Sequence, residues 1–259
     1  MGVLNVTPDS FFDGGRWIDP SAAVAHAHEM MAQGAAIIDV GGESTRPGAE
    51  PVDEAEELKR VLPVVEALGS REALVSIDTR KPAVAERALG AGASIINDTS
   101  GEASVRPMDQ LAADSGAAII VMHSRGTPAS MGSLTDYADV VADVNAFLAT
   151  RAAELESAGV RRDGICLDPG IGFAKTAPQS LSLLRRLDEL VILGYPVVVG
   201  TSRKSFIGSA LDLAEEERLE GSIATVVWAV ERGALIVRVH DVEPVARAVH
   251  MTEAIRASS

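Results

Sequence analysis

The 259-residue chain has few features of a secreted, membrane or disulfide-stabilised protein. Its one cysteine, Cys166, cannot form a disulfide within the chain, and because it lies in an apolar run we interpret it as a buried core residue rather than a nucleophile. No apolar run approaches the roughly 20 residues that a membrane-spanning helix needs, and residues 1–6 lack the basic region of a signal peptide. We therefore expect a soluble protein of the reducing cytoplasm.

Basic residues are also scarce. The chain has 23 Lys and Arg against 37 Asp and Glu, which gives a net charge of -14. Nucleic acids and anionic membranes are bound by extended basic surfaces, so we expect neither as a partner. An anionic ligand would have to be held by a small local cluster of cations.

The chain repeats one pattern, in which an apolar segment is followed by a loop and then by apolar residues at helical spacing. Strands that are apolar on both faces and separated by helices indicate a parallel sheet, and eight such units predict a (β/α)₈ TIM barrel of class α/β. An open, doubly wound sheet is the alternative. No linker or change in composition divides the chain, so we expect one domain over residues 1–259. The strand segments are 1–6, 37–42, 74–78, 95–98, 118–123, 165–168, 197–200 and 236–240.

Polar side chains stand where most of these segments end. In a (β/α)₈ barrel the carboxyl ends of the strands form one face, and that face carries the active site. Asp168 is the clearest case, because Pro169 and Gly170 follow it and force a sharp turn. Any one of these residues alone is better explained as a loop residue or a helix cap. Together they indicate a site, and they are Asn5, Asp78, Asn97, Asp98, His123, Asp168, Ser202, Arg203, Lys204, Arg238 and His240.

Two kinds of chemistry are present at these strand ends. Carboxylate and amide groups suit a flat, nitrogen-rich heterocycle with several N–H donors, and they come from Asp78, Asn97 and Asp168. Groups that donate to an anion come from Asn5, Arg238 and His240, with Arg46 on a nearby loop. Metal ligation by the two carboxylates stays open as an alternative, although the His-rich spacing of a zinc site is missing.

Seven segments carry a family resemblance, and they occur in order at the expected strand ends. They are 5–11 (NVTPDSF), 41–48 (GGESTRPG), 76–79 (SIDT), 96–98 (IND), 167–173 (LDPGIGF), 202–205 (SRKS) and 238–241 (RVHD). Over essentially its whole length the sequence resembles the dihydropteroate synthase family. The resemblance implies a (β/α)₈ barrel that joins 6-hydroxymethyl-7,8-dihydropterin diphosphate to 4-aminobenzoate. It also implies release of diphosphate, use of Mg²⁺ and a homodimer.

The resemblance further implies a role for individual residues. Those matching the pterin site are Asp78, Asn97, Met122, Asp168, Phe173 and Lys204. Those matching the diphosphate site are Asn5, Arg46, Arg238 and His240, with Asn5 as the Mg²⁺ ligand. Those matching positions around the aminobenzoate are Phe11, Thr45, Arg46, Pro47 and Ser205. The expected catalytic residues are Asp78, Asp168, Lys204, Arg238 and His240.

This reaction needs no strong nucleophile from the protein, because loss of diphosphate leaves a cation delocalised into the dihydropterin ring. We therefore expect catalysis by positioning and electrostatics. Three other functions remain possible from the sequence: a sulfonamide-insensitive synthase, a pterin-barrel methyltransferase acting with a corrinoid protein, and a noncatalytic paralogue. The methyltransferase would have no use for residues 202–204, Arg238 or His240, and a paralogue would be expected to have lost one of the site residues.

Overall fold

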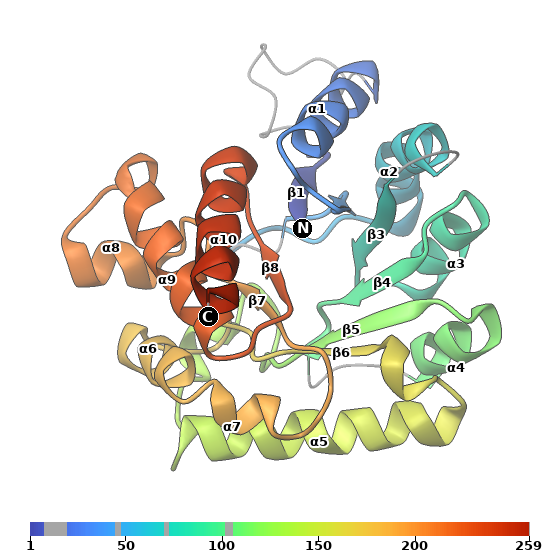
Figure 1. Ribbon diagram of the computed structural model, residues 1–259. Coiled ribbons are helices and arrows are strands. Elements are labelled where there is room, and N and C mark those ends of the chain that lie inside the picture. The colour runs from blue at the N-terminus through green and yellow to red at the C-terminus, as the bar shows by residue number, and fades with distance from the viewer. Residues whose placement is uncertain (8–19, 45–47, 70–72, 102–105, 259) are drawn as a thin grey trace.

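Parallel strands and helices alternate along the chain, in a computed structural model that describes residues 1–7, 20–44, 48–69, 73–101 and 106–258. Strands β1 to β6 form one parallel sheet in sequence order, and β7 pairs with β8. Helices surround the strands (Figure 1). The strands are β1 Gly2–Asn5, β2 Ile37–Gly41, β3 Leu74–Thr79, β4 Ile95–Asp98, β5 Ala118–Met122, β6 Ile165–Asp168, β7 Val198–Gly200 and β8 Ile236–Arg238.

Backbone contacts close the two sheets into a barrel. Leu167 of β6 forms a parallel bridge to Val197, just before β7, and Gly2 of β1 forms one to Val239, just after β8. The Val3 N–H donates to the Val239 carbonyl at 3.0 Å, which seals the junction between the last strand and the first. The predicted (β/α)₈ barrel is therefore confirmed, and the open doubly wound sheet is excluded.

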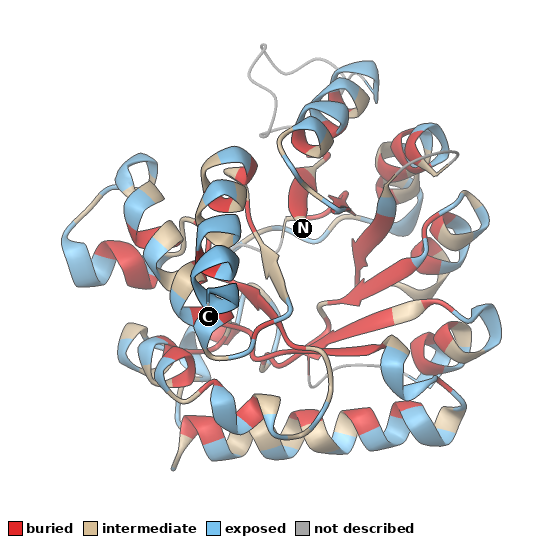
Figure 2. Ribbon diagram, in the orientation of Figure 1, coloured by how far each residue is buried: buried red, intermediate tan, exposed pale blue. Residues whose placement is uncertain are grey.

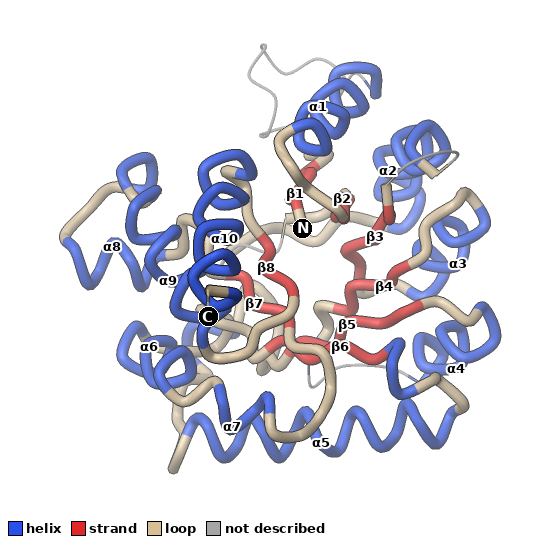
Figure 3. The backbone as a smooth tube through the Cα atoms, viewed as in Figure 1, coloured by secondary structure: helices blue, strands red, loops and turns tan. Residues whose placement is uncertain are grey.

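The helices form an outer ring around this barrel (Figure 3). They are α1 Pro20–Ala32, α2 Glu54–Leu68, α3 Pro82–Gly90, α4 Arg106–Ser115, α5 Val140–Ala158, α6 Ala177–Arg185, α7 Asp188–Val191, α8 Ser205–Leu211, α9 Leu219–Glu231 and α10 Val242–Ala257. Short 3₁₀ helices lie at Met131–Ser133, Arg162–Gly164 and Glu215–Glu217. In the described part of the chain no helix combines the length and the apolar character needed to cross a membrane.

Side-chain caps fix where several helices begin. The Asp53 carboxylate accepts from the Glu56 N–H at 2.8 Å at the start of α2, and Asp139 accepts from two N–H groups at the start of α5. Thr176 and Gln179 form a capping box at the start of α6. Such caps satisfy N–H groups that the helix leaves unpaired, so each helix starts at a defined residue beyond its strand.

Apolar side chains form two cores, one on each side of the barrel wall. The larger core lies between the strands and the surrounding helices, and the strands are buried along most of their length (Figure 2). The smaller core fills the barrel interior and consists of Ile37, Ile95, Ile120, Cys166 and Val198. Cys166 is thus a buried core residue, as predicted. Many polar groups lie beyond this core, toward the carboxyl ends of the strands.

Candidate active site

Strand register places most of the predicted site residues at one level of the barrel mouth. Asn5 pairs with Gly41, Gly41 with Asp78, and Asp78 with Asn97. On the other side of the barrel Met122 pairs with Asp168, and Gly200 pairs with Arg238. Paired residues on neighbouring parallel strands point to the same face, so these side chains converge on the mouth of the barrel.

Arg238 bridges two carboxylates across the barrel mouth. Its Nε donates to Asp39 Oδ2 at 2.6 Å, and its Nη2 donates to Asp78 Oδ2 at 2.8 Å. Asn97 Nδ2 also donates to Asp39 Oδ2, at 3.1 Å, and Thr99 Oγ1 donates to Asp78 Oδ1 at 3.1 Å. Residues from β2, β3, β4 and β8 thus form one hydrogen-bonded cluster.

Burial and neighbouring charges shift the pKa values within this cluster. Burial raises the pKa of the Asp78 carboxyl above its ordinary value, the Arg238 guanidinium opposes that rise, and the charge on Asp39 adds to it. Burial would lower the pKa of Arg238, but Asp39 and Asp78 outweigh it, so the pKa is raised and the guanidinium stays charged. One cation therefore faces two carboxylates, which favours a ligand that donates hydrogen bonds or gains positive charge.

Asp39 is the carboxylate of this cluster that sequence reasoning missed. It lies in the middle of β2, fully buried, and its Oδ1 has no hydrogen-bond partner among the described residues. Its Oδ2 receives hydrogen bonds from both Arg238 and Asn97, so it orients two predicted ligand-binding side chains. The available signal was a carboxylate that interrupts the apolar run 37–40, because a charge at such a position is costly unless it is paired.

Asp168 ends β6 and is held by the turn that follows it. Its Oδ1 accepts from the Gly170 N–H at 2.7 Å. Gly170 has a φ of 65°, and a Cβ at this position would lie 1.9 Å from the His123 carbonyl oxygen. Only glycine fits such a conformation and such a close approach, so the Asp-Pro-Gly sequence fixes where the carboxylate stands.

Lys204 lies on the other side of this turn. Its Nζ donates to the Ile171 carbonyl and lies 4.3 Å from the centroid of the Phe173 ring. Burial lowers the pKa of Lys204 to about 8, although the charge on Asp168 opposes the shift. Burial also raises the pKa of Asp168, and the charge on Lys204 opposes that change. The two groups therefore offer an acceptor and a donor beside an aromatic face.

A second missed residue, Lys175, fixes the far end of the same turn. This lysine is buried, and its Nζ lies 3.0 Å from His123 Nδ1. It also donates to the His123 carbonyl at 3.2 Å and to the Phe173 carbonyl at 2.8 Å. Burial lowers the pKa of His123 to about 3, so the imidazole is neutral and can accept at Nδ1. The contact between Lys175 and His123 thus joins the end of β5 to the turn that follows Asp168.

His240 lies beyond β8 and contacts the loop after β7. Its Nδ1 lies 3.1 Å from Ser202 Oγ, and its backbone N–H donates to the same oxygen at 3.2 Å. Arg203, with a φ of 59°, pairs with Asp241 through Nε and Oδ2 at 2.9 Å. These contacts hold the predicted segments 202–205 and 238–241 together at the barrel mouth.

The remaining predicted residues are divided between the described and undescribed parts of the chain. Phe11, Thr45, Arg46 and Pro47 lie outside the described residues, as does most of the first long loop. Ser205 is the exposed first residue of α8.

The donor groups at the mouth fit a Mg²⁺ ion that arrives with a phosphate ligand. Among the described residues no three His, Cys, Asp or Glu side chains group as a metal site. Asn5, at the end of β1, can offer one hard amide oxygen. Mg²⁺ commonly keeps waters and substrate phosphates as ligands and takes few ligands from the protein. The pairing of Asp78 with Arg238 also argues against a metal held by the carboxylates.

Comparison with known proteins agrees with this geometry. The pterin binding enzyme family matches residues 1–240. A dihydropteroate synthase of Synechocystis sp. is 48% identical over 257 residues, which are 98% of this chain and 89% of that protein. The solved structure of the Clostridium difficile synthase in the presence of pteroic acid has a TM-score of 0.92 and 44% identity, covering 99% of this chain and 96% of that one.

The Xanthomonas albilineans synthase with 4-aminobenzoic acid has a TM-score of 0.93 and 41% identity, covering 100% of this chain and 93% of that one. These relatives are synthases, which supports a synthase over the methyltransferase, one of the three alternatives that the sequence left open. The chain belongs to the dihydropteroate synthase family of pterin-binding enzymes, which are transferases of folate biosynthesis.

Proposed function

We propose that the barrel mouth binds 6-hydroxymethyl-7,8-dihydropterin diphosphate and joins it to 4-aminobenzoate, giving 7,8-dihydropteroate and diphosphate. The observation that carries this proposal is the hydrogen-bonded cluster of Arg238, Asp39, Asp78 and Asn97 at the same face as Asp168 and Lys204. We take residues 1–259 as one pterin-binding domain.

The pterin would lie between the cluster and the turn after β6. Asp168 and Asn97 would take its N–H groups, and Lys204 would donate to a ring acceptor. Met122, buried beside Asp168 in the strand register, and Phe173 would contact the ring faces. Asp78 and Asp168 would favour positive charge that grows on the ring when the leaving group departs.

The diphosphate would be held at the other side of the mouth by Asn5, Arg46, Arg238 and His240. Bound Mg²⁺, with Asn5 as its protein ligand, would supply positive charge to the leaving oxygens. Arg238 donates to Asp39 and Asp78, and their carboxylates hold its guanidinium at a defined place. His240 is oriented by Ser202 in the same way.

The reaction would be a dissociative substitution at the exocyclic methylene. The C–O bond breaks, and diphosphate leaves with the electron pair. The amine nitrogen of 4-aminobenzoate then forms the C–N bond and loses a proton. No side chain attacks the substrate, so the protein contributes position and electrostatic stabilisation. Phe11, Thr45, Arg46, Pro47 and Ser205 are proposed to surround the aminobenzoate.

We also propose that the protein is a cytoplasmic homodimer. Apolar side chains on and near α9 are exposed at the surface of the chain, and they include Trp228, Leu181 and Leu211. Val226 and Val230 on the same helix are buried in the core, so α9 presents apolar residues to two sides. A second copy could cover the outer side, and the molar mass in solution tests this.

The division of the site into pterin and diphosphate halves can be tested with His240→Ala. His240 faces the proposed anion site and contacts neither Asp168 nor Asn97 in any described hydrogen bond. We expect the dissociation constant for the diphosphate substrate to rise roughly tenfold, as for the loss of a charge-assisted contact. A pterin without the diphosphate should bind as before. Equal losses for both ligands, measured by calorimetry, would show that His240 serves the whole pocket instead.

A further inference from the structure

Thr99 is a residue without an assigned role that contacts the pterin cluster. It lies directly after β4, and its Oγ1 donates to Asp78 Oδ1 at 3.1 Å. The other oxygen of that carboxylate, Oδ2, accepts from Arg238 Nη2 at 2.8 Å. Asp78 is buried, whereas Thr99 is partly exposed. Donors from two sides therefore hold the two oxygens of one carboxylate.

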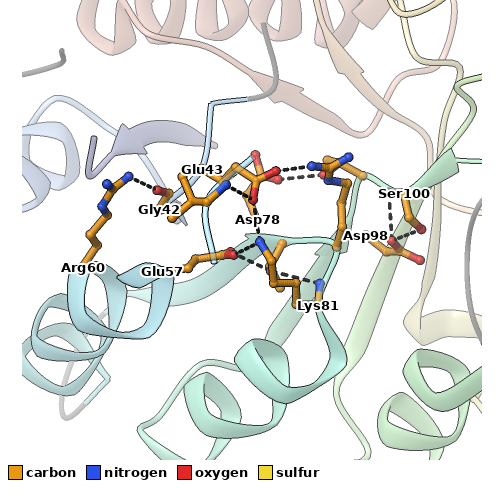
Figure 4. Close-up of polar contacts among 12 residues, drawn as sticks. Gly42, Glu43, Glu57, Arg60, Asp78, Lys81, Asp98 and Ser100 are labelled. Carbon is orange, nitrogen blue, oxygen red and sulfur yellow. Dashed lines mark hydrogen bonds and ion pairs between the residues drawn. The ribbon is translucent and has the colours of Figure 1, made fainter. Parts of the chain in front are cut away.

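A turn at the end of β4 holds Thr99 in place. Asp98, the last residue of this strand, accepts at Oδ1 from the Ser100 backbone N–H at 3.0 Å and from Ser100 Oγ at 2.5 Å (Figure 4). A carboxylate that accepts from the N–H two residues ahead forms a compact turn. A Cβ at Gly101, which has a φ of 63°, would lie 2.5 Å from the Ser124 carbonyl oxygen, so the turn rests against the loop after β5. Thr99 stands inside this turn, and its backbone is therefore fixed.

The end of β3, which carries Asp78, is held from its other face. Thr79 follows Asp78, and successive residues of a strand point to opposite faces, so Thr79 faces α2. Its Oγ1 donates to Glu57 Oε1 at 2.7 Å and accepts from the Lys81 N–H at 3.2 Å. Lys81 Nζ in turn donates to Glu57 Oε2 at 2.5 Å (Figure 4). Because β3 and β4 pair at this level, the backbones that carry Asp78 and Thr99 are fixed relative to each other.

The contact from Thr99 also favours the charged form of the Asp78 carboxylate. Burial raises the pKa of Asp78 most, and the hydrogen bond from Thr99 is one of the contacts that lower it. A hydroxyl donates more strongly to a carboxylate than to a neutral acid, so this bond opposes the effect of burial. The charged groups that face Asp78 come from four different parts of the chain, and they are Arg238, Asp39, Glu57 and Lys204. Without the Thr99 hydroxyl, the carboxylate would take up a proton more readily.

We propose that Thr99 is a positioning residue for Asp78. Its hydroxyl fixes the plane of that carboxylate and keeps its negative charge at the face where the pterin ring gains positive charge. This inference rests on the proposed function, in which Asp78 stabilises the charge that grows as diphosphate leaves. Such an interaction is made mainly in the transition state, so losing the Thr99 contact should lower kcat more than it changes either KM.

The test compares Thr99→Val with Thr99→Ser in steady-state assays of dihydropteroate formation. The valine variant keeps the shape of the side chain without its hydroxyl, whereas the serine variant keeps the hydroxyl. We expect kcat to fall roughly tenfold in Thr99→Val, as for loss of one hydrogen bond to a charged group, with both KM values within about twofold of wild type. Thr99→Ser should retain most of the wild-type kcat. Thr150→Val, on the exposed side of α5, is the control and should match wild type.

The pH dependence of kcat gives a readout that a merely structural role would not move. Asp78 must be ionised to stabilise the cation, so kcat should fall as the pH drops through the pKa of this carboxyl. The midpoint of that fall should lie about one pH unit higher in Thr99→Val, because the carboxylate has lost a donor. Thr99→Ser should restore the wild-type midpoint. Lys204 and His240 are the same in all three proteins, so the difference in midpoint reports on Asp78.

Ser100→Ala is a second variant, because it removes one contact of the turn and leaves the Thr99 hydroxyl in place. It should lower kcat in the same direction but by less, and it keeps the proposal testable if Thr99→Val does not fold. Unchanged kcat in a folded Thr99→Val protein, an equal loss in Thr99→Ser, or a raised KM for the pterin diphosphate at wild-type kcat would overturn the proposal. An inactive wild-type protein in the same assay would instead contradict the proposed function.

Discussion

The charge on Lys204 titrates near neutral pH, and this has a measurable consequence. Burial lowers its pKa to about 8, so the ammonium loses its proton as the pH rises through that value. If the charged form donates to the pterin, affinity for the pterin diphosphate should fall above pH 8 by up to roughly tenfold per pH unit. Calorimetric titrations between pH 7 and 9.5 would measure the slope.

Lys204→Arg provides the control for this slope, because a guanidinium stays charged throughout the range. The arginine variant should bind more weakly at pH 7, since its shape differs, but its affinity should no longer fall with pH. Lys59→Arg, on the exposed side of α2, should keep the wild-type slope. A decline of equal steepness in Lys204→Arg would assign the titration to another group.

At the residue scale, sequence reasoning could find the side chains that end strands but not those that support them. Asp78, Asn97, Asp168 and Arg238 were predictable, because polar residues follow apolar runs at those positions. Asp39 interrupts an apolar run, which marks it as unusual, but its role was not predictable because its partner Arg238 lies 199 positions away in the chain. A supporting contact between distant residues leaves no local pattern in a single sequence.

At the scale of elements, the turn after β6 depends on an imidazole that must stay neutral. The pKa of His123 is lowered to about 3 by burial, whereas an unfolded histidine titrates near 6.5. Between these values the unfolded chain binds the extra proton and the folded protein does not. Proton binding by the unfolded chain therefore lowers the free energy of unfolding as the pH falls from 6.5 toward 3, by up to ~1.4 kcal/mol per pH unit. Above pH 6.5 this loss is absent.

His123→Gln should remove this pH dependence of the free energy of unfolding. The variant should be less stable than wild type at pH 7, because Lys175 loses its imidazole partner, and the difference should shrink between pH 6.5 and 4.5. Denaturant unfolding at several pH values measures the free energy of unfolding for both proteins. His26→Gln, on the exposed side of α1, serves as the control and should keep the wild-type pH dependence. A constant difference between His123→Gln and wild type across the range would mean that His123 accepts a proton in the folded state.

The elements themselves were largely predictable, because strands buried on both faces give continuous apolar runs between helical patterns. The residues at which the elements end were harder to predict. The last strand was predicted over 236–240 but ends at Arg238. Pairing with β7 covers residues 236–238, and Val239 pairs with the first strand instead: its N–H donates to the Met1 carbonyl, and its own carbonyl accepts from Val3. Val239 therefore bonds to the first strand, and such a contact cannot be seen in the local sequence.

At the scale of the whole molecule, an acidic protein builds a site for an anionic substrate at one face. The net charge is -14, yet Arg238, Lys204 and His240 gather at the barrel mouth, as the scarcity of basic residues required. Barrel closure brings β8 beside β1, the neighbour of β2, and the Arg238 side chain reaches Asp39 of β2. The eight repeats predicted this closure. The sequence alone could not show how the turn after β6 is held, because that depends on the contact between Lys175 and His123.

The central claim is that one barrel mouth binds the pterin and carries out the substitution. It is tested most directly by dihydropteroate formation from the pterin diphosphate, 4-aminobenzoate and Mg²⁺, in wild type and in Asp168→Asn. The amide would place an N–H donor against a pterin donor, at a cost of roughly 1 to 3 kcal/mol. We predict equal amounts of dihydropteroate and diphosphate from wild type and, in Asp168→Asn, a kcat/KM for the pterin lower by about tenfold or more. Asp163→Asn, an exposed carboxylate ahead of β6, should match wild type. Unchanged kcat/KM in a folded Asp168→Asn protein would contradict the account.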